Sequence, residues 1–318
     1  MAKLTIPIEL MADYDLWNSF LDRCVPRLQY VRVEEPIDSL TNYGPAHLSM
    51  FLSFFAHHSR DLRELTLRGK YEIPCPLLQV LSRNCPHLHA LDVQGEVSFF
   101  GWDRIGISTQ LHALRSLTLK KSNLADHDIS PLLDLCPNLE ALELGNSNGI
   151  TQNGLVDVFN SHAPLKTIKI QGMRYLHGTT IMHHPVLRVR PELTEVALDC
   201  IVSDEFLTAL SHSCPSLTHL SVKNSSELTR VGILSVSRAC TQLTDLTIAH
   251  CRRVPSDIRS YFSHSVLVDF TPSDTWFDFP IFPIDFPIPP LFDEAAFDDI
   301  LLQGTIIEEG VVNTNLLS

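Results

Sequence analysis

The segment Cys136-Pro-Asn-Leu-Glu-Ala-Leu-Glu-Leu144 recurs along this chain of 318 residues. Close copies are Cys85-Pro-His-Leu-His-Ala-Leu-Asp-Val93 and Cys214-Pro-Ser-Leu-Thr-His-Leu-Ser-Val222. Looser copies place their first leucine at Leu28, Leu62, Leu114, Leu165, Leu193 and Leu243. The nine copies follow each other at intervals of 24 to 28 residues after a first interval of 34. A period of this length predicts a repeat architecture.

Each copy predicts one short strand followed by one helix. Counting the first leucine as zero, apolar residues fall at positions 0, 3 and 5, and positions 3 and 5 share one face of a strand. In Thr151–Asn160, Leu155, Val158 and Phe159 have the spacing of one helical face, and Thr151 suits an N-cap. Ser203–Leu210 and Thr229–Val236 repeat this arrangement.

A strand and a helix this short cannot bury their apolar faces alone, so consecutive copies must stack. Strands pack about 4.8 Å apart and helices about 8–10 Å apart, which bends the stack with its strands inside. We therefore predict a curved, right-handed α/β solenoid with concave strands and convex helices. Its predicted parts are an N-terminal cap or flank (1–23), about nine repeats (24–268) and a C-terminal tail (269–318).

The second half of the unit is clearest in Gly149-Ile-Thr-Gln-Asn-Gly-Leu155 and Glu227-Leu-Thr-Arg-Val-Gly-Ile233. Together with the Cys-Pro-x-Leu segments, these motifs resemble the cysteine-containing leucine-rich repeats of F-box proteins. Members of that family recognise substrates for Skp–cullin–F-box (SCF) ubiquitin ligases. The resemblance covers roughly residues 24–262 and implies a leucine-rich-repeat fold, a protein client, and the Skp adaptor and cullin as partners if an F-box is present.

The chain departs from the family pattern because no F-box is readable in it. Ile6-Pro-Ile-Glu-Leu-Met11 resembles only the opening turn of that domain, and the first repeat begins near Cys24. Two functions therefore stay open. One is substrate recognition for an SCF ligase, and the other is an inhibitor or regulator that works without a ligase.

The net charge of −13 is concentrated at the C-terminal end. Residues 269–318 hold ten acidic and no basic side chains, which leaves residues 1–268 close to neutral. Such a body offers no basic surface for nucleic acid or anionic lipid. No stretch has the length and apolarity of a membrane span, and no secretory signal is visible at the N-terminus, so we expect a cytoplasmic or nuclear protein.

The sequence indicates no catalytic residue, cofactor or metal site. Cys24, Cys85, Cys136, Cys214 and Cys240 precede the first leucine of a copy, which predicts packing at helix ends rather than disulfides or zinc binding. The histidine pairs at 57–58 and 183–184 lack partners at ligand spacing. No nucleotide-binding or hydrolase motif is present. We therefore expect a non-catalytic protein.

Recognition residues are expected at the outward strand positions, relative 2, 4 and 6. The predicted central column is Arg32, Thr66, Asp92, Thr118, Glu143, Lys169, Ala197, Ser221 and Thr247. The flanking columns add Tyr30, Glu64, Glu195, His219 and Asp245 on one side, and Glu34, Arg68, Lys120, Gln171, Asp199 and Lys223 on the other. The candidate protein-binding residues are Arg32, Arg68, Glu143, Lys169, Glu195, His219 and Lys223. A merely solvated face remains the alternative, because binding hot spots favour Trp, Tyr and Arg.

Three irregular segments compete with this face. Pro36–Pro45 and Met173–His184 interrupt the period, and the second contributes Arg174, Tyr175 and His177 as further candidates. The tail combines aromatic residues with six prolines between residues 269 and 290. It is expected to cap the last repeat, with a free acidic interaction segment as the alternative.

Overall fold

The computed structural model describes residues 3–7, 29–34, 55, 59–68, 71–100, 110–122, 124–147, 149–173 and 186–271. They lie in one unit, Met1–Ser273, and Asp274–Ser318 forms a second. Pro36–Pro45, residues 174–184 and the tail beyond residue 271 lie outside the described residues.

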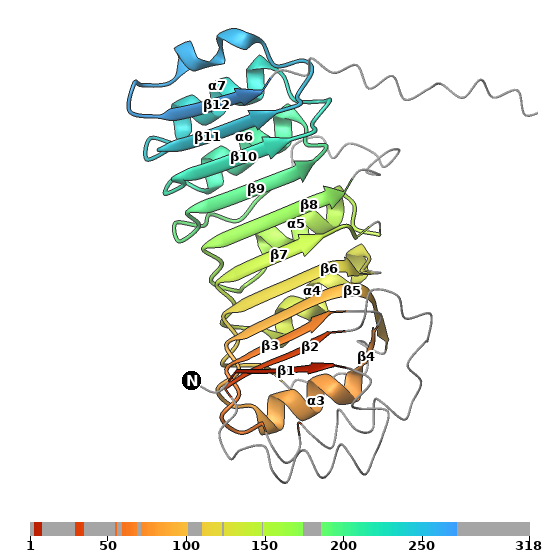
Figure 1. Ribbon diagram of the computed structural model, residues 1–318. Coiled ribbons are helices and arrows are strands. Elements are labelled where there is room, and N and C mark those ends of the chain that lie inside the picture. Colours follow the sequence, from red (N-terminus) through yellow and green to blue (C-terminus); the bar gives the residue numbers. More distant parts are fainter. Residues whose placement is uncertain are drawn as a thin grey trace, which may run out of the picture. The chain divides into compact units, whose positions relative to one another are not determined.

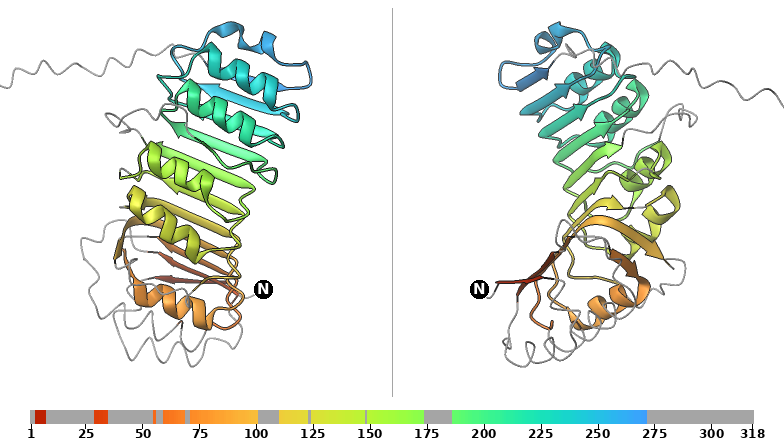
Figure 2. Two further views of the ribbon diagram at one scale, coloured as in Figure 1. Left: turned by 180° about the vertical axis from the view of Figure 1, so that it is seen from behind. Right: turned by 45° about the vertical axis from the view of Figure 1, so that its right-hand side comes forward.

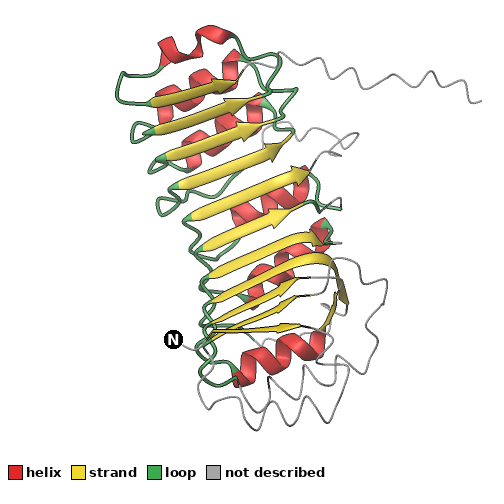
Figure 3. Ribbon diagram, viewed as in Figure 1, coloured by secondary structure: helices red, strands yellow, loops and turns green. Residues whose placement is uncertain are grey.

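The described strands form one twelve-stranded sheet in which every neighbouring pair is parallel (Figures 1 and 3). The strands are β1 (Lys3–Pro7), β2 (Tyr30–Glu34), β3 (Glu64–Arg68), β4 (Tyr71–Pro74), β5 (Ala90–Phe100), β6 (Ser116–Ser122), β7 (Ala141–Gly145), β8 (Thr167–Met173), β9 (Glu195–Cys200), β10 (His219–Lys223), β11 (Asp245–Ala249) and β12 (Leu267–Thr271). They stack in sequence order, except that β4 pairs only with the far end of β5. This is the α/β solenoid order that the repeats predict.

The described helices lie together on one face of the sheet (Figure 2). They are α3 (Cys75–Asn84), α4 (Asp126–Leu135), α5 (Gln152–Asn160), α6 (Asp204–Ser213), α7 (Arg230–Ala239) and the short 3-10 helix η4 (Ser256–Tyr261). The predicted N-cap is confirmed for three of them: the Thr151, Ser203 and Thr229 hydroxyls each accept a hydrogen bond from a first-turn N–H.

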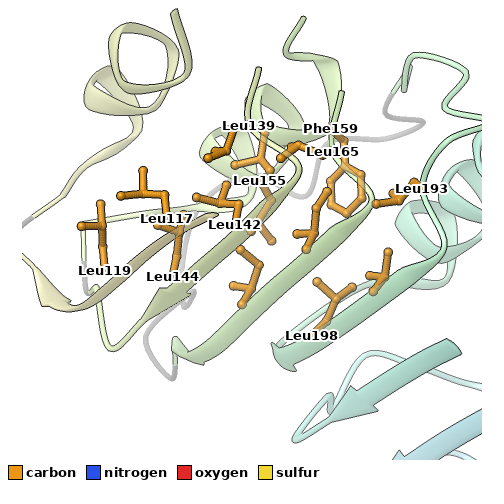
Figure 4. Close-up of a cluster of buried hydrophobic side chains, with 14 of the residues drawn as sticks. Leu117, Leu119, Leu139, Leu142, Leu144, Leu155, Phe159, Leu165, Leu193 and Leu198 are labelled. Carbon is orange, nitrogen blue, oxygen red and sulfur yellow. The ribbon is translucent and has the colours of Figure 1, made fainter. Parts of the chain in front are cut away.

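Leucine and its apolar equivalents fill the space between the sheet and the helices. Leu139, Leu142 and Leu144 are all buried, as the repeat predicts. Leu142 lies in register with Leu117 on β6 and Ile168 on β8, so equivalent side chains form continuous rows across the strands. Figure 4 shows these rows meeting Leu155 and Phe159 of α5. Every repeat thus contributes to a core that belongs to its neighbours as well.

A carboxylate at the start of one helix caps the start of the next. Asp204 in the first turn of α6 accepts hydrogen bonds from Thr229 N at 2.8 Å and Gly232 N at 3.0 Å, and also from the Thr229 hydroxyl. Asp126 of α4 makes the same contacts with the first turn of α5. Negative charge is favourable at a helix N-terminus, where backbone N–H groups lack partners. The Thr-x-x-Gly motif therefore serves to join consecutive repeats.

The repeat cysteines end the helices, as predicted. Cys136, Cys214 and Cys240 are the C-cap residues of α4, α6 and α7, and all three are buried free thiols. Burial raises the pKa of Cys136 and of Cys214 to about 12. Thiols of this kind are protonated and unreactive at neutral pH, which fits a packing role. Cys24 lies outside the described residues.

One repeat replaces this cysteine by arginine. Arg190-Pro-Glu-Leu193 occupies the place of Cys136-Pro-Asn-Leu139, and Arg190 is 1% exposed. Its guanidinium donates to the Phe159 carbonyl at 2.6 Å and the Ala163 carbonyl at 2.8 Å, and to both oxygens of Ser161. Burial lowers the pKa of Arg190 from its usual value. The guanidinium thus donates to several carbonyl groups at and just beyond the C-terminus of α5, where the last carbonyl groups of a helix have no intrahelical partner.

The sheet also contains strands that the repeat count does not predict. β1 lies inside the segment 1–23 predicted as a cap or flank, and it pairs with β2 of the first repeat. β12 crosses the predicted boundary at residue 268. β5 runs on to Phe100 and pairs with β4 in place of an immediate turn. Val97 and Phe99 are β-favouring residues, and Tyr71 and Ile73 in β4 are of the same kind.

We predict that Gly232→Ala destabilises the protein although alanine favours helix. A Cβ at Gly232 would lie 2.6 Å from Asp204 Oδ1, closer than van der Waals contact allows. We expect a loss of about 1–2 kcal/mol in urea denaturation. In an Asp204→Ala background the same change should cost less, because the contact with the carboxylate is gone and only the close approaches to Leu228 Cδ1 at 2.8 Å and to the Asp204 Cα at 3.3 Å remain. Equal losses in both backgrounds would contradict the contact.

We predict that Arg190→Cys destabilises the protein although it restores the cysteine that five other repeats have at or next to this place. The change removes the hydrogen bonds that Arg190 donates to the carbonyl groups of Phe159, Ser161 and Ala163 and opens a space beside α5. A loss of about 2–4 kcal/mol is expected from thermal or urea unfolding. The control is Arg188→Cys, two residues earlier at an exposed position, which should cost well under about 1 kcal/mol.

Candidate functional site: the open sheet face

The sheet face opposite the helices, termed here the open sheet face, carries the outward strand residues. The predicted central column is confirmed from end to end: Arg32, Thr66, Asp92, Thr118, Glu143, Lys169, Ala197, Ser221 and Thr247 are register partners in succession. Each lies between two buried residues on its own strand, as Glu143 lies between Leu142 and Leu144. The face is therefore an ordered array of polar side chains on a rigid backbone.

Charges on this face are paired across neighbouring strands. Lys120 Nζ on β6 lies 2.7 Å from Glu143 Oε1 on β7, and Lys169 Nζ on β8 lies 2.8 Å from Glu195 Oε1 on β9. His219 on β10 similarly contacts Asp245 on β11, with 3.1 Å between Nε2 and Oδ2. Partly exposed pairs like these contribute about 0–1 kcal/mol each. The fold does not depend on them, so these positions are available for recognition.

The predicted site residues fall into three groups. Glu143, Lys169, Glu195, His219 and Lys223 lie together on the open sheet face of β7 to β10. Arg32 and Arg68 lie on the same sheet but on β2 and β3, so at least three strand spacings, or about 14 Å, separate them from Glu143. Arg174, Tyr175 and His177 lie outside the described residues.

The last strand adds functional candidates that sequence reasoning missed. β12 aligns Leu267 with Asp245 and Asp269 with Thr247, so both side chains continue columns of the open sheet face. Leu267 is 64% exposed. The alternation in Leu267-Val-Asp-Phe-Thr271, with Val268 buried, was the available signal. It was missed because no copy of the leucine pattern follows Leu243 at the usual spacing.

A charged cluster borders the face where the strands begin. Glu140 lies between Lys166, whose Nζ is 2.6 Å from Oε2, and Arg115, whose Nε is 3.5 Å from Oε1. The hydrogen bond from Lys166 and the two positive charges hold the pKa of Glu140 below its usual range. Glu140 is therefore ionised at neutral pH, and its surroundings are those of a surface ion pair.

The described residues include no group of three His, Cys, Asp or Glu side chains placed to hold a metal ion. Within the same residues, no helix has the length and apolarity needed to cross a bilayer. Burial raises the pKa of the Cys85, Cys136, Cys200, Cys214, Cys240 and Cys251 thiols, which is a consequence of core packing.

Part of the chain is similar to a known family of repeats. Residues 53–188 match the family model described as "FBD-associated F-box protein At5g56370, LRR repeats". This match supports the resemblance: residues 53–188 are similar to leucine-rich repeats of an F-box-associated protein, within an α/β repeat array. A search of the curated proteins found no match.

Adjacent residues on β9 allow a direct test of which side faces solvent. Leu198→Asp, toward the helices, should lose about 3–5 kcal/mol of unfolding free energy because an unpaired charge would be buried. Ala197→Asp, on the open sheet face, should stay within about 0.5 kcal/mol of wild type. Urea denaturation measures both, and a reversed order would show that the face is assigned to the wrong side.

Proposed function

We propose that this chain binds another protein through the open sheet face, and that it serves as the substrate-recognition repeat domain of an SCF-type ubiquitin ligase. The observation that carries the proposal is the F-box-associated type of the repeats, together with a face whose outward side chains the core does not require. Leucine-rich-repeat arrays of this architecture act by presenting surface, and we propose that the chain catalyses no reaction itself.

The dimensions of the face suit a protein partner. The ten strands from β2 to β12 along the main path span about 43 Å at the usual strand spacing, and five residues of each extend over about 16 Å. The resulting area is close to the roughly 800 Å² per partner of a standard interface. We further propose a cytoplasmic or nuclear location, which the buried free cysteines support because such compartments keep thiols reduced.

One observation favours the second candidate, a regulator that works without a ligase. Ile6-Pro-Ile-Glu-Leu-Met11 is the segment that resembles the opening of an F-box. Ile6 and Pro7 belong to β1, which pairs in parallel with β2, so these residues extend the repeat sheet. On this second proposal the chain captures its client without recruiting the Skp adaptor.

Affinity capture from cell extract tests the binding proposal. We expect wild-type protein to retain a defined client, and Ala197→Arg with Ser221→Arg to lose it, because two large side chains would then stand in the central column. The matched control adds the same two side chains on the helix side, as Asn153→Arg with Val231→Arg at exposed positions of α5 and α7. Equal retention by all three proteins would contradict binding through the open sheet face.

Direct titration with purified Skp adaptor separates the two functions. Saturable binding of the adaptor together with client capture supports the ligase proposal. Client capture without adaptor binding supports the ligase-independent regulator. If the protein binds neither the adaptor nor any client from several extracts, both proposed functions are contradicted.

A further inference from the structure

The charge on the open sheet face is uneven along the stack. On β6 to β9, Glu143 and Glu195 are each neutralised by a lysine. The outward residues of β9 to β12 are Glu195, Ala197, Asp199, His219, Ser221, Lys223, Asp245, Thr247, Leu267, Asp269 and Thr271. Four carboxylates therefore face one lysine in this region.

Three of these carboxylates form no ion pair with a lysine or arginine among the described residues. Asp199 accepts a hydrogen bond of 2.5 Å from the neutral Asn224 amide, which leaves its charge in place. Asp245 contacts His219, which offsets the charge only when the imidazole is protonated. Asp269 has no ion pair among the described residues, and its side chain is exposed. Because unpaired surface charges steer partners of opposite sign, this region favours a cationic ligand.

On β9 to β11, small side chains occupy the central column, between the flanking columns that carry the charged residues. Ala197, Ser221 and Thr247 are consecutive register partners in the central column, and Asp269 follows them on β12. Upstream, the same column holds the longer Glu143 and Lys169. A chain crossing β9 to β11 can therefore approach the sheet backbone more closely than one crossing β7 and β8.

An exposed apolar side chain lies beside the carboxylates. Leu267 is among the large apolar side chains that the described surface leaves exposed, and it is the register partner of Asp245. The burial pattern of β12 places Leu267, Asp269 and Thr271 on the same side of the strand, opposite the buried Val268. An exposed leucine among anions is complementary to a ligand that has both positive charge and an apolar side chain.

We propose that the outward face of β9 to β12 docks an extended basic segment of the partner protein. In this arrangement its Lys or Arg side chains lie on Asp199, Asp245 and Asp269, and an apolar side chain packs on Leu267. The four strands span about 14 Å, which matches four or five residues of extended chain. The inference rests on the proposed binding function, and it specifies where the client is held and by which chemistry.

Fluorescence anisotropy with labelled peptide pools tests this proposal on the full chain. The basic pool has peptides of about eight residues with Lys or Arg at three positions, one Leu, and Ser or Gly elsewhere. The acidic pool replaces each Lys or Arg by Glu. We expect saturable binding of the basic pool, weakened by added salt, and none of the acidic pool.

Two sets of variants locate the contact. Asp245→Asn with Asp269→Asn should weaken binding of the basic pool by roughly tenfold, and Leu267→Ser should weaken it by roughly threefold. The control, Asp134→Asn with Asp157→Asn, removes the same charge from α4 and α5 and should leave binding unchanged. Thermal melts of all variants confirm that they are folded.

The outcomes separate this inference from the function on which it rests. Absence of basic-pool binding, equal binding of the acidic pool, or equal weakening by the control variant would overturn the inference. The Asp245→Asn with Asp269→Asn variant is then used in client capture from extract. Undiminished capture of the client would leave the binding function standing and overturn the basic-segment contact, whereas reduced capture supports both.

Discussion

The structure depends on register between neighbouring repeats. A five-residue strand with two inward leucines and a helix of about ten residues each leave one apolar side uncovered, and neither is stable alone in water. Stacking covers these apolar sides only when equivalent residues align, as Leu117, Leu142 and Ile168 do. A shift by one residue would turn the leucines to solvent. Register therefore determines which side chains form the core and which form the open sheet face.

Polar contacts between repeats strengthen the same register. The Asp204 carboxylate reaches the first turn of α7 only when α6 and α7 start at equivalent heights, and Gly232 leaves the room for it. Arg190 provides a related contact at the other helix end, where it replaces a cysteine and gathers carbonyl groups around the end of α5. These contacts are directional, so they select one stacking among those that hydrophobic burial alone would accept.

The division between inward and outward positions also separates stability from recognition. Inward positions accept only apolar residues of similar size, which is why the repeats resemble one another and match a family model. Outward positions tolerate nearly any side chain, and their charge and size here vary from one strand to the next. The difference between the paired charges of β6 to β9 and the more acidic region of β9 to β12 arises from this freedom. We expect the charge and size of these outward side chains to determine which client protein is bound.

The local patterns of this sequence were sufficient to predict the strand of each repeat, the helix starts at Thr151, Ser203 and Thr229, the cysteine helix ends and the central column of outward residues. Those features follow from periods of 2 and 3.6 residues, which are read within one repeat. The sequence did not predict the role of Arg190, the Asp204–Gly232 contact, the pairing of Lys120 with Glu143, or β12 as a further strand. Each joins residues of different repeats, some 25 positions apart in the chain. Only stacking brings such residues within hydrogen-bonding distance, so only the tertiary structure decides which of them meet.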